Sequence, residues 1–161
     1  MSPKDPPLDE IQWRSPQIVA SMGGLHDNTV LHYFAESPFF EPTSNNAVLT
    51  SQAWNNPQMA QFIATREAME DRLRTMSGLE FMVAEAPADP NPGMGTGVWV
   101  IRKQTRRKQP GRDDDITIHA TYFVVGEHIY QAPTLGDVLT SKLVSCVFFG
   151  CHGLGSFNDY E

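Results

Sequence analysis

The fold is decided by residues 98–133, which read VWVIRKQTRRKQPGRDDDITIHATYFVVGEHIYQAP. Residues 98–101 form a short apolar run, and apolar side chains alternate with polar ones over residues 116–124, which is the period of a β-strand. The pair Gly126-Glu127 then separates this strand from residues 128–131, as in a tight hairpin. Because no helical pattern lies between these strands, the stretch predicts an antiparallel β-meander.

Helical patterns occur on both sides of the meander, and a second alternating stretch over residues 79–83 predicts one more strand. The expected helices cover residues 16–22, 28–36, 59–76 and the residues after Pro133. The fold class is therefore α+β, with an antiparallel sheet flanked by N-terminal, middle and C-terminal helices. We expect residues 1–10 to be a disordered tail and residues 11–158 to form a single domain.

Individual side chains refine the expected helices. Asp27 is the expected N-cap of the helix over residues 28–36. In the middle helix, Glu70 and Arg74 are four residues apart and are expected to pair on the solvent side. Residues 37–57 show no clear period and are interpreted as an ordered loop with aromatic anchors and a short helix near residues 48–54.

Length and composition exclude several classes of protein. The chain has 161 residues, of which 40% are hydrophobic, which suffices for one buried core, and it has no apolar run long enough to cross a membrane. Its polar first ten residues do not resemble a secretory signal, and its two cysteines cannot form a disulfide framework. The net charge of −7 argues against general binding to nucleic acid or to anionic lipid.

Positive charge is concentrated in one window. Six of the 12 basic residues lie between Arg102 and Arg112, and three aspartates follow at once. The window is either a solvated strand end balanced by these aspartates, a nuclear import signal or a contact with an acidic partner. Stacking aromatic residues are absent from it apart from Trp99, which argues against direct binding to nucleic acid. The candidates for an acidic-partner contact are Arg102, Lys103, Arg106, Arg107 and Lys108.

No motif indicates catalysis, a metal site or a cofactor. The glycines of residues 93–97 precede a strand, whereas a phosphate-binding loop follows a strand and opens a helix. Cys146, Cys151 and His152 lack the ligand spacing of a structural zinc site, and the other histidines are scattered. We therefore predict a non-enzymatic protein without catalytic residues, cofactor or metal.

The expected final helix has apolar residues on two faces. A helix on the surface of a monomer needs one apolar stripe, so the second face must pack against loops of the same chain or against another protein. We predict a partner contact, and the residues of this second face are Val144, Val147, Phe148 and Cys151. Phe39 and Phe40 are second candidates, as aromatic anchors of an interface.

Several short motifs follow one another in a characteristic order. The first runs from Tyr33-Phe34 through Ser37-Pro38 to Ser44-Asn45-Asn46. Next come residues 76–81 and the basic strand end at residues 102–107, and last the hairpin from residue 122 with Tyr130, Gln131 and Pro133. In this order the motifs resemble those of the Mediator complex subunit 6 family, over about residues 10–150.

The resemblance implies a half-barrel-like sheet and a non-enzymatic scaffold subunit in the head module of Mediator, the nuclear coactivator of RNA polymerase II transcription. The implied partners are head subunits 8, 11 and 17, with a contact to the middle module through subunit 14 and an indirect link to RNA polymerase II. Members of the family continue in a variable tail beyond the position of Glu161. The alternative is a basic-patch module that binds nucleic acid or an acidic peptide.

Overall fold

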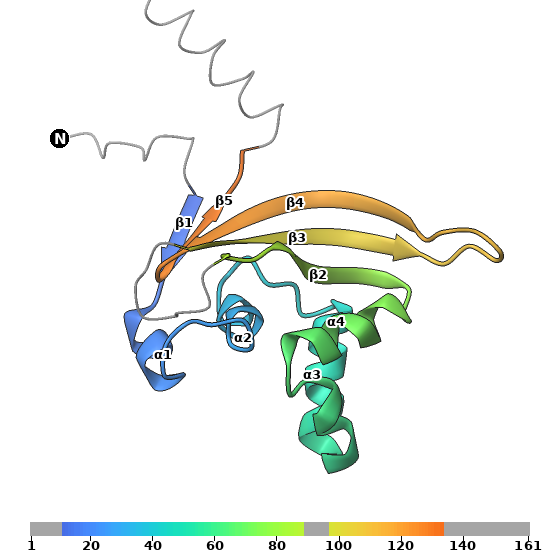
Figure 1. Ribbon diagram of the computed structural model, residues 1–161, viewed down its shortest axis with the longest axis horizontal. Coiled ribbons are helices and arrows are strands. Elements are labelled where there is room, and N and C mark those ends of the chain that lie inside the picture. Colours follow the sequence, from blue (N-terminus) through green and yellow to red (C-terminus); the bar gives the residue numbers. More distant parts are fainter. Residues whose placement is uncertain (1–10, 89–96, 134–161) are drawn as a thin grey trace, which may run out of the picture. The chain divides into compact units, whose positions relative to one another are not determined.

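The computed structural model describes residues 11–88 and 97–133. Its elements, in chain order, are β1 (Ile11–Arg14), α1 (Pro16–Ser21), α2 (Val30–Ala35), α3 (Asn45–Asn55), the 3-10 helix η1 (Pro57–Phe62), α4 (Arg66–Arg74), β2 (Gly78–Glu85), β3 (Val98–Arg107), β4 (Asp115–Val125) and β5 (His128–Gln131) (Figure 1). The predictions for the tail at residues 1–10, the domain boundary at residue 158 and the final helix concern residues outside the described ranges.

The described strands form one sheet in the order β1-β5-β4-β3-β2. The predicted meander is confirmed, because β2 pairs with β3, β3 with β4, and β4 with β5, each time antiparallel. β1, which precedes all the described helices, lies beside β5 and not beside β2. The predicted α+β class with an antiparallel sheet is therefore correct.

β4 carries one extra residue opposite the middle of β3. Lys103 pairs with Ala120 and Gln104 pairs with Ile118, which leaves His119 without a partner in the ladder. Such a bulge bends the strand and increases its local twist. Beyond the bulge, the β3–β4 hairpin continues past the helices (Figure 1).

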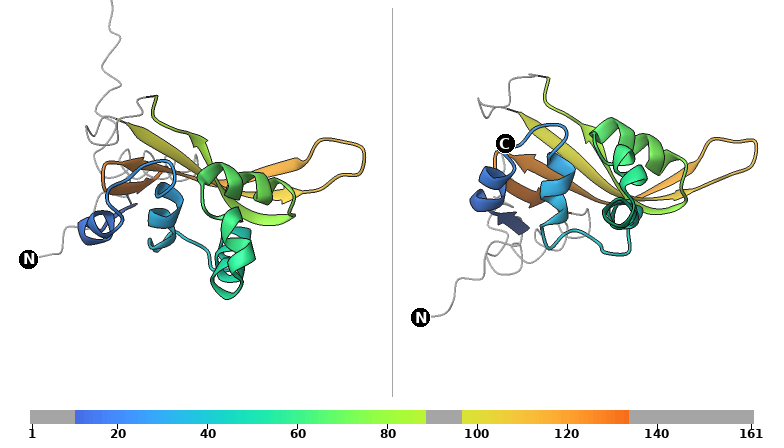
Figure 2. Two further views of the ribbon diagram at one scale, coloured as in Figure 1. Left: turned by 60° about the horizontal axis from the view of Figure 1, so that its bottom comes forward. Right: turned by 90° about the horizontal axis from the view of Figure 1, so that it is seen from below.

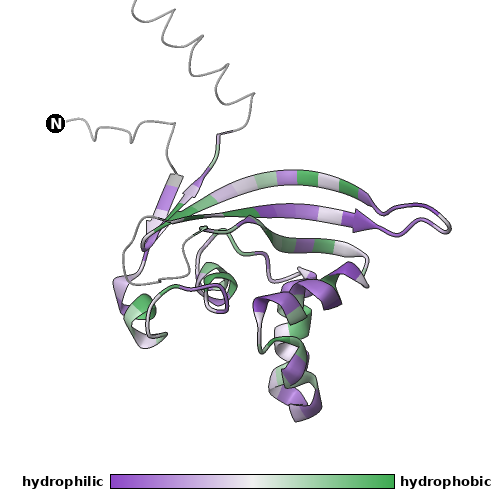
Figure 3. Cartoon of the chain, in the orientation of Figure 1, coloured by the Kyte–Doolittle hydropathy of each residue, from purple (hydrophilic) through white to green (hydrophobic). Residues whose placement is uncertain are grey.

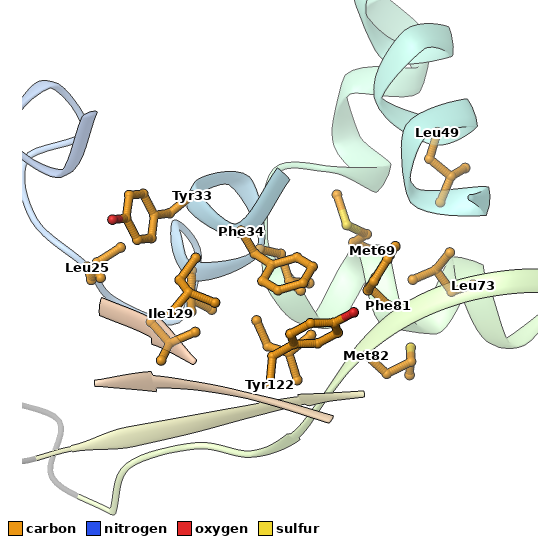
Figure 4. Packing of buried hydrophobic residues seen from close by; sticks show 14 residues of the cluster. Leu25, Tyr33, Phe34, Leu49, Met69, Leu73, Phe81, Met82, Tyr122 and Ile129 are labelled. Carbon is orange, nitrogen blue, oxygen red and sulfur yellow. The ribbon is translucent and has the colours of Figure 1, made fainter. Parts of the chain in front are cut away.

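The helices α1 to α4 lie on one face of the sheet (Figures 1 and 2), and the hydrophobic core lies between them and the strands. At the centre of this core, the ring of Phe34 from α2 contacts Phe81 of β2 and Tyr122 of β4, with ring centroids 5.1 and 5.0 Å away (Figure 4). Aromatic residues bury more apolar area than any other side chains, so this cluster contributes a large share of the packing energy.

The predicted middle helix is wrong in its extent. Residues 57–62 form the 3-10 helix η1, and α4 begins only at Arg66. The N-cap of α4 is Thr65, whose hydroxyl accepts a hydrogen bond from the amide of Ala68 at 3.1 Å. The apolar period persists through the break, because Ile63 and Met69 both pack on the same core. Periodicity alone therefore does not reveal the break.

Two further predictions about polar residues are wrong, one of them only in part. The predicted pair of Glu70 and Arg74 is present, with a nitrogen–oxygen distance of 4.0 Å, but Glu70 is only 4% exposed and so is not on the solvent side. Asp27 does not cap α2, whose N-cap is Thr29. Asp27 instead accepts hydrogen bonds from Arg66 at 3.2 Å and from the indole of Trp99 at 3.2 Å, and it thereby connects the loop before α2 to α4 and β3.

The outer edge of β2 is covered by side chains from α3 and α4. Asn46 accepts a hydrogen bond from the Phe81 amide at 2.8 Å and donates one to the Phe81 carbonyl at 2.9 Å, as a neighbouring strand would. Glu70 accepts from the amide of Val83 at 3.1 Å, and Asn45 donates to the carbonyl of Ser77 at 3.1 Å. These contacts satisfy backbone groups that an edge strand would otherwise leave open.

Candidate interaction surfaces

The basic end of β3 contains a buried ion pair. Glu80 of β2 is fully buried, and Arg106 of β3 is 9% exposed. Arg106 Nη2 donates to Glu80 Oε1 at 2.8 Å and Arg106 Nε donates to the same oxygen at 3.1 Å, while Gln104 Nε2 donates to it at 2.7 Å. A buried carboxylate is tolerated only when such donors replace the water it has lost. Arg106 therefore binds a carboxylate of its own chain, and the prediction that it contacts an acidic partner is wrong.

Asp114 forms a second ion pair with the guanidinium group of Arg106, through Nη1, the nitrogen that makes no hydrogen bond to Glu80. Its Oδ2 accepts from Arg106 Nη1 at 2.8 Å and from Lys108 Nζ at 2.9 Å, and Lys108 also donates to the carbonyl of Arg74. Lys108 and then Arg106 hold the pKa of Asp114 below its usual value. Desolvation acts to lower the pKa of Arg106, but Glu80 and Asp114 outweigh it and raise that pKa. The interpretation of a strand end balanced by acidic residues is confirmed for Asp114.

The other basic candidates divide into two groups. Lys103 donates to Glu41 at 3.0 Å and is partly buried. Arg102 and Arg107 are exposed, and neither has an ion pair among residues 12–88 and 97–133. Figure 3 shows this hydrophilic half of β3 beside β4. A contact with an acidic partner therefore stays a prediction, best suited to Arg102 on one face of β3 or to Arg107 on the other.

Phe39 and Phe40 both pack against the core of their own chain. The Phe39 ring lies 5.3 Å from the ring of Tyr122, and the Phe40 ring stacks on Phe81 with centroids 5.3 Å apart. Both side chains are half-buried. Their contact with a partner stays a prediction, which would depend on the part of each ring that remains exposed.

Tyr33 connects three distant parts of the fold. It is fully buried, and its hydroxyl accepts a hydrogen bond from the amide of Ser15 at 2.9 Å and donates one to the carbonyl of Glu127 at 2.6 Å. Burial raises the pKa of Tyr33, so the hydroxyl keeps its proton. The residue thus fixes α2 to the start of α1 and to the β4–β5 turn.

The other motif residues have structural roles in the described fold. Ser37 is buried and donates to the carbonyl of Phe34 at 2.7 Å, and Ser44 caps α3 by accepting from the amide of Ala47 at 3.3 Å. Tyr130 pairs with Phe123 in the ladder, and its ring stacks on His128 with centroids 5.9 Å apart. Gln131 pairs with Tyr122, whereas Pro38 and Pro133 are exposed.

The face of β3 and β4 opposite Ile101 and Tyr122 carries exposed hydrophobic side chains. Alternation along the strands and the bulge in β4 together place them on this face. They are Val98, Ile116, Ile118, Phe123 and Val125, each between 37% and 51% exposed. An exposed apolar surface of this kind is typical of a protein that contacts other proteins.

The structure does not cover the predicted contacts after residue 133, but it does bear on metal binding and on membrane spans within the described residues. Val144, Val147, Phe148 and Cys151 lie beyond the described residues, so their contact with a partner stays a prediction. Within residues 11–88 and 97–133, no cluster of three metal-ligating side chains occurs. In the same ranges no helix is long and apolar enough to span a membrane.

Sequence reasoning missed two polar features of the site. Both the Asn46 bonds to Phe81 and the Glu80–Arg106 pair join residues far apart in the chain. A signal for the second was present, because alternation in β3 separates Arg106 from Arg107 and puts them on opposite faces. No local signal identifies the backbone group to which Asn46 binds.

Taken together, the observations define an α+β protein with exposed apolar and basic side chains on its sheet. The family model described as "MED6 mediator sub complex component" matches residues 11–151. The chain belongs to this family of Mediator subunit 6 proteins.

Relatives and solved structures agree with this assignment. The chain is 56% identical over 147 residues to the Mediator of RNA polymerase II transcription subunit 6 of Neurospora crassa, a match that covers 86% of this chain and 40% of the relative. The chain thus spans less than half the length of this curated relative.

Two solved structures are similar to the described fold. The Schizosaccharomyces pombe Mediator subunit Med6 is 30% identical, with a TM-score of 0.59 over 89% of this chain and 90% of that chain. A chain in the Schizosaccharomyces pombe Mediator head module is 29% identical, with a TM-score of 0.62 over 96% of this chain and 93% of that chain.

Proposed function

We propose that this chain is a structural subunit of the Mediator head module that supports RNA polymerase II transcription by packing against neighbouring subunits, without catalysis. The observation that carries the proposal is the similarity to a chain of the Schizosaccharomyces pombe Mediator head module over 96% of this sequence. Membership of the Mediator subunit 6 family over residues 11–151 supports it independently.

Within that assembly, the proposed role is to link head subunits 8, 11 and 17 and to contact the middle module through subunit 14, in the nucleus. The mechanism is burial of apolar surface. A permanent interface buries about 2,000 Å² or more and is rich in apolar residues. The proposed contact residues are Val144, Val147, Phe148 and Cys151, with the exposed parts of Phe39 and Phe40 as secondary contacts.

A subunit that links others must keep its own surfaces in fixed positions. Here the polar contacts of Tyr33 and Asn46 join residues 94 and 35 positions apart in the chain, respectively. Such contacts make the helices and the sheet move together. Preorganised surfaces lose less conformational entropy on binding, so this rigidity supports a scaffold role.

The test is reconstitution of the head module with this chain. The unmodified chain is co-expressed with head subunits 8, 11 and 17, and the purified complexes are weighed by native mass spectrometry. We expect stable incorporation, and a Val147→Asp/Phe148→Asp variant should weaken it while a Gln109→Arg variant should not. An unmodified chain that stays monomeric beside all three subunits would contradict the proposal.

The basic-patch alternative has less support. Arg106 is buried against Glu80, and Lys103 and Lys108 have acidic partners within the chain. What remains is a contact of Arg102 or of Arg107, which lie on opposite faces of β3, with an acidic loop of a neighbouring subunit. Such a contact affects the association rate and its salt dependence more than the affinity. An Arg102→Glu/Arg107→Glu variant with an unchanged association rate at low salt would exclude it.

A further inference from the structure

Residues 42–65 contain no charged side chain and no histidine. At the chain's average of 19% charged residues, a stretch of this length would carry about four or five. This segment forms α3 and η1, between Glu41 and Arg66. The absence of charge is unusual for a segment on the surface, even though many of its residues are Ser, Thr, Asn, Gln or Pro, which are mostly exposed in folded proteins.

This uncharged segment is nevertheless largely exposed. Trp54, near the end of α3, is 83% exposed, and Val48 on the same helix is 39% exposed. Ser51, Gln52 and Asn55 are exposed as well. Tryptophan is highly buried on average in folded proteins, so an indole left this open is unusual. We call the exposed residues Val48, Ser51, Trp54 and Asn55 together with Met59 the α3–η1 face.

The α3–η1 face borders a hollow between α3, η1 and α4. The hollow has a volume of about 460 Å³ and is lined by Ser51, Gln52, Asn55, Asn56, Met59 and Arg72. Most of the lining is uncharged and polar, from one serine, one glutamine and two asparagines, and Met59 is its only apolar side chain. The one charged group is Arg72, whose guanidinium lies 5.2 Å from the centre of the Phe62 ring. The hollow is large enough to accept one or two side chains of a partner.

The N-terminal end of α3 is fixed to the sheet by hydrogen bonds, whereas its C-terminal end is exposed to solvent. Ser44 caps the helix, Asn46 binds both backbone groups of Phe81, and Leu49 is buried. Trp54 lies two turns further on, at the end of α3 that is remote from the sheet (Figure 1). The indole is thus presented on a fixed support, which reduces the entropy lost on binding.

We propose that the α3–η1 face is a docking surface for an uncharged segment of a neighbouring polypeptide, which receives the indole of Trp54 in an apolar pocket and offers hydrogen-bonding groups to the amides of the hollow. Interface centres are depleted of charge and enriched in tryptophan and methionine, as this face is. The chemistry of the partner follows from the same observation. A nucleic acid would meet one cation that already lies over an aromatic ring, and a charged peptide would meet no row of opposite charges.

This inference rests on the proposed function, because the polypeptide is taken to be another subunit of the same assembly. It adds a surface built from residues other than the proposed contacts Val144, Val147, Phe148 and Cys151 and other than the basic end of β3. It also explains why the segment has no charge, since charges at this position would have to be desolvated on binding.

The test compares the full chain with two variants in binding to a head assembly reconstituted without this subunit. Trp54→Ala removes the anchor, and Ser51→Arg introduces a charge at an exposed position of the same face. We expect a loss of affinity of roughly 30-fold for Trp54→Ala, which corresponds to a central anchor, and a comparable loss for Ser51→Arg. Matched controls are Gln109→Arg, in the β3–β4 loop, and Gln17→Ala, at an exposed position of α1; both should bind as the unmodified chain does.

A second measurement is independent of mutation. Oxidative footprinting should show Trp54 protected in the complex and reactive in the free chain. Circular dichroism and thermal unfolding of the variants should be unchanged, because both side chains are exposed.

The outcomes separate the two proposals. If the unmodified chain binds no head assembly, the proposed function fails. If it binds, but both variants stay within threefold of it and Trp54 remains reactive, the docking inference fails while the proposed function stands. Self-association or DNA retention that Trp54→Ala abolishes would also overturn the inference, because the occupant would then be a second copy or a nucleic acid.

Discussion

Replacement of Asn46 by alanine tests how the edge of the sheet is held. The side chain is 4% exposed and makes two hydrogen bonds to the backbone of Phe81, at 2.8 and 2.9 Å. The substitution leaves one amide and one carbonyl group without these partners. An unsatisfied buried polar group costs about 1–3 kcal/mol. We expect Asn46→Ala to lower the free energy of unfolding by about 3 kcal/mol, because water reaches an edge strand more easily than a central one.

The neighbouring residue provides a matched control. Asn45 makes one exposed hydrogen bond, to the carbonyl of Ser77 at 3.1 Å, in the same turn of α3. An exposed bond is readily replaced by water, so Asn45→Ala should cost less than about 1 kcal/mol. Because the two substitutions share a helix and a residue type, their difference isolates the contact with β2.

The assay is urea unfolding of the full chain, followed by circular dichroism, with hydrogen exchange of the β2 amides as a local readout. The amides of Phe81 and Val83 should exchange faster in Asn46→Ala than in Asn45→Ala. Equal stability losses for the two variants, with no change in exchange at Phe81, would refute the claim that Asn46 replaces a missing strand.

Three further predictions concern polar groups that connect distant parts of the fold. Arg106→Leu should lower the free energy of unfolding by about 3–5 kcal/mol because it leaves Glu80 buried without its cation, and adding Glu80→Leu should recover much of this loss; a double variant as unstable as the two losses combined would contradict the pairing. Asp114→Asn should destabilise the protein at neutral pH. Since the pKa of Asp114 is lowered in the folded state, its contribution is complete above its ordinary pKa of about 4 and is lost as the pH falls through the lower native value, so unfolding curves of the two proteins should converge with acid. Tyr33→Phe removes both hydrogen bonds of the hydroxyl, and the melting temperature should report a loss of about 1–3 kcal/mol; an unchanged melting temperature would show that the bridge from Ser15 to Glu127 is dispensable.

The sequence allowed correct prediction of β2 to β5 because their signal is local, whereas the four-residue strand β1 (Ile11–Arg14) is too short to give a period and was not predicted. Alternation over residues 116–124 and the short linker at Gly126-Glu127 need no knowledge of distant residues. The predicted helix over residues 59–76 failed for the opposite reason. The apolar period runs through the break at residues 63–65, and what separates η1 from α4 is the capping hydroxyl of Thr65.

The interaction surfaces were less predictable, because exposure depends on register. The basic window was interpreted as one unit, yet in β3 its residues alternate between the two faces, so Arg106 is buried and Arg107 is exposed. Similarly, the sequence pattern predicts that the aromatic residues within residues 37–57 all act as anchors. Phe39 and Phe40 pack on the core, whereas Trp54 is almost fully open to solvent. The sequence alone does not show which of these rings is buried, because that depends on how the loop and α3 pack on the sheet.

The pairing of early and late segments has a consequence for biosynthesis. The hydroxyl of Tyr33 needs the carbonyl of Glu127, and Phe34 needs the ring of Tyr122. At 5–20 residues per second, a ribosome takes roughly 3–10 s to proceed from the end of α4 to Glu127. During that interval α2 lacks the rings and aliphatic side chains of β4 and β5 against which part of its apolar surface is buried in the finished fold. We therefore expect the nascent chain to expose this apolar surface, as a potential binding site for chaperones or for a co-assembling neighbour, until β5 has been translated.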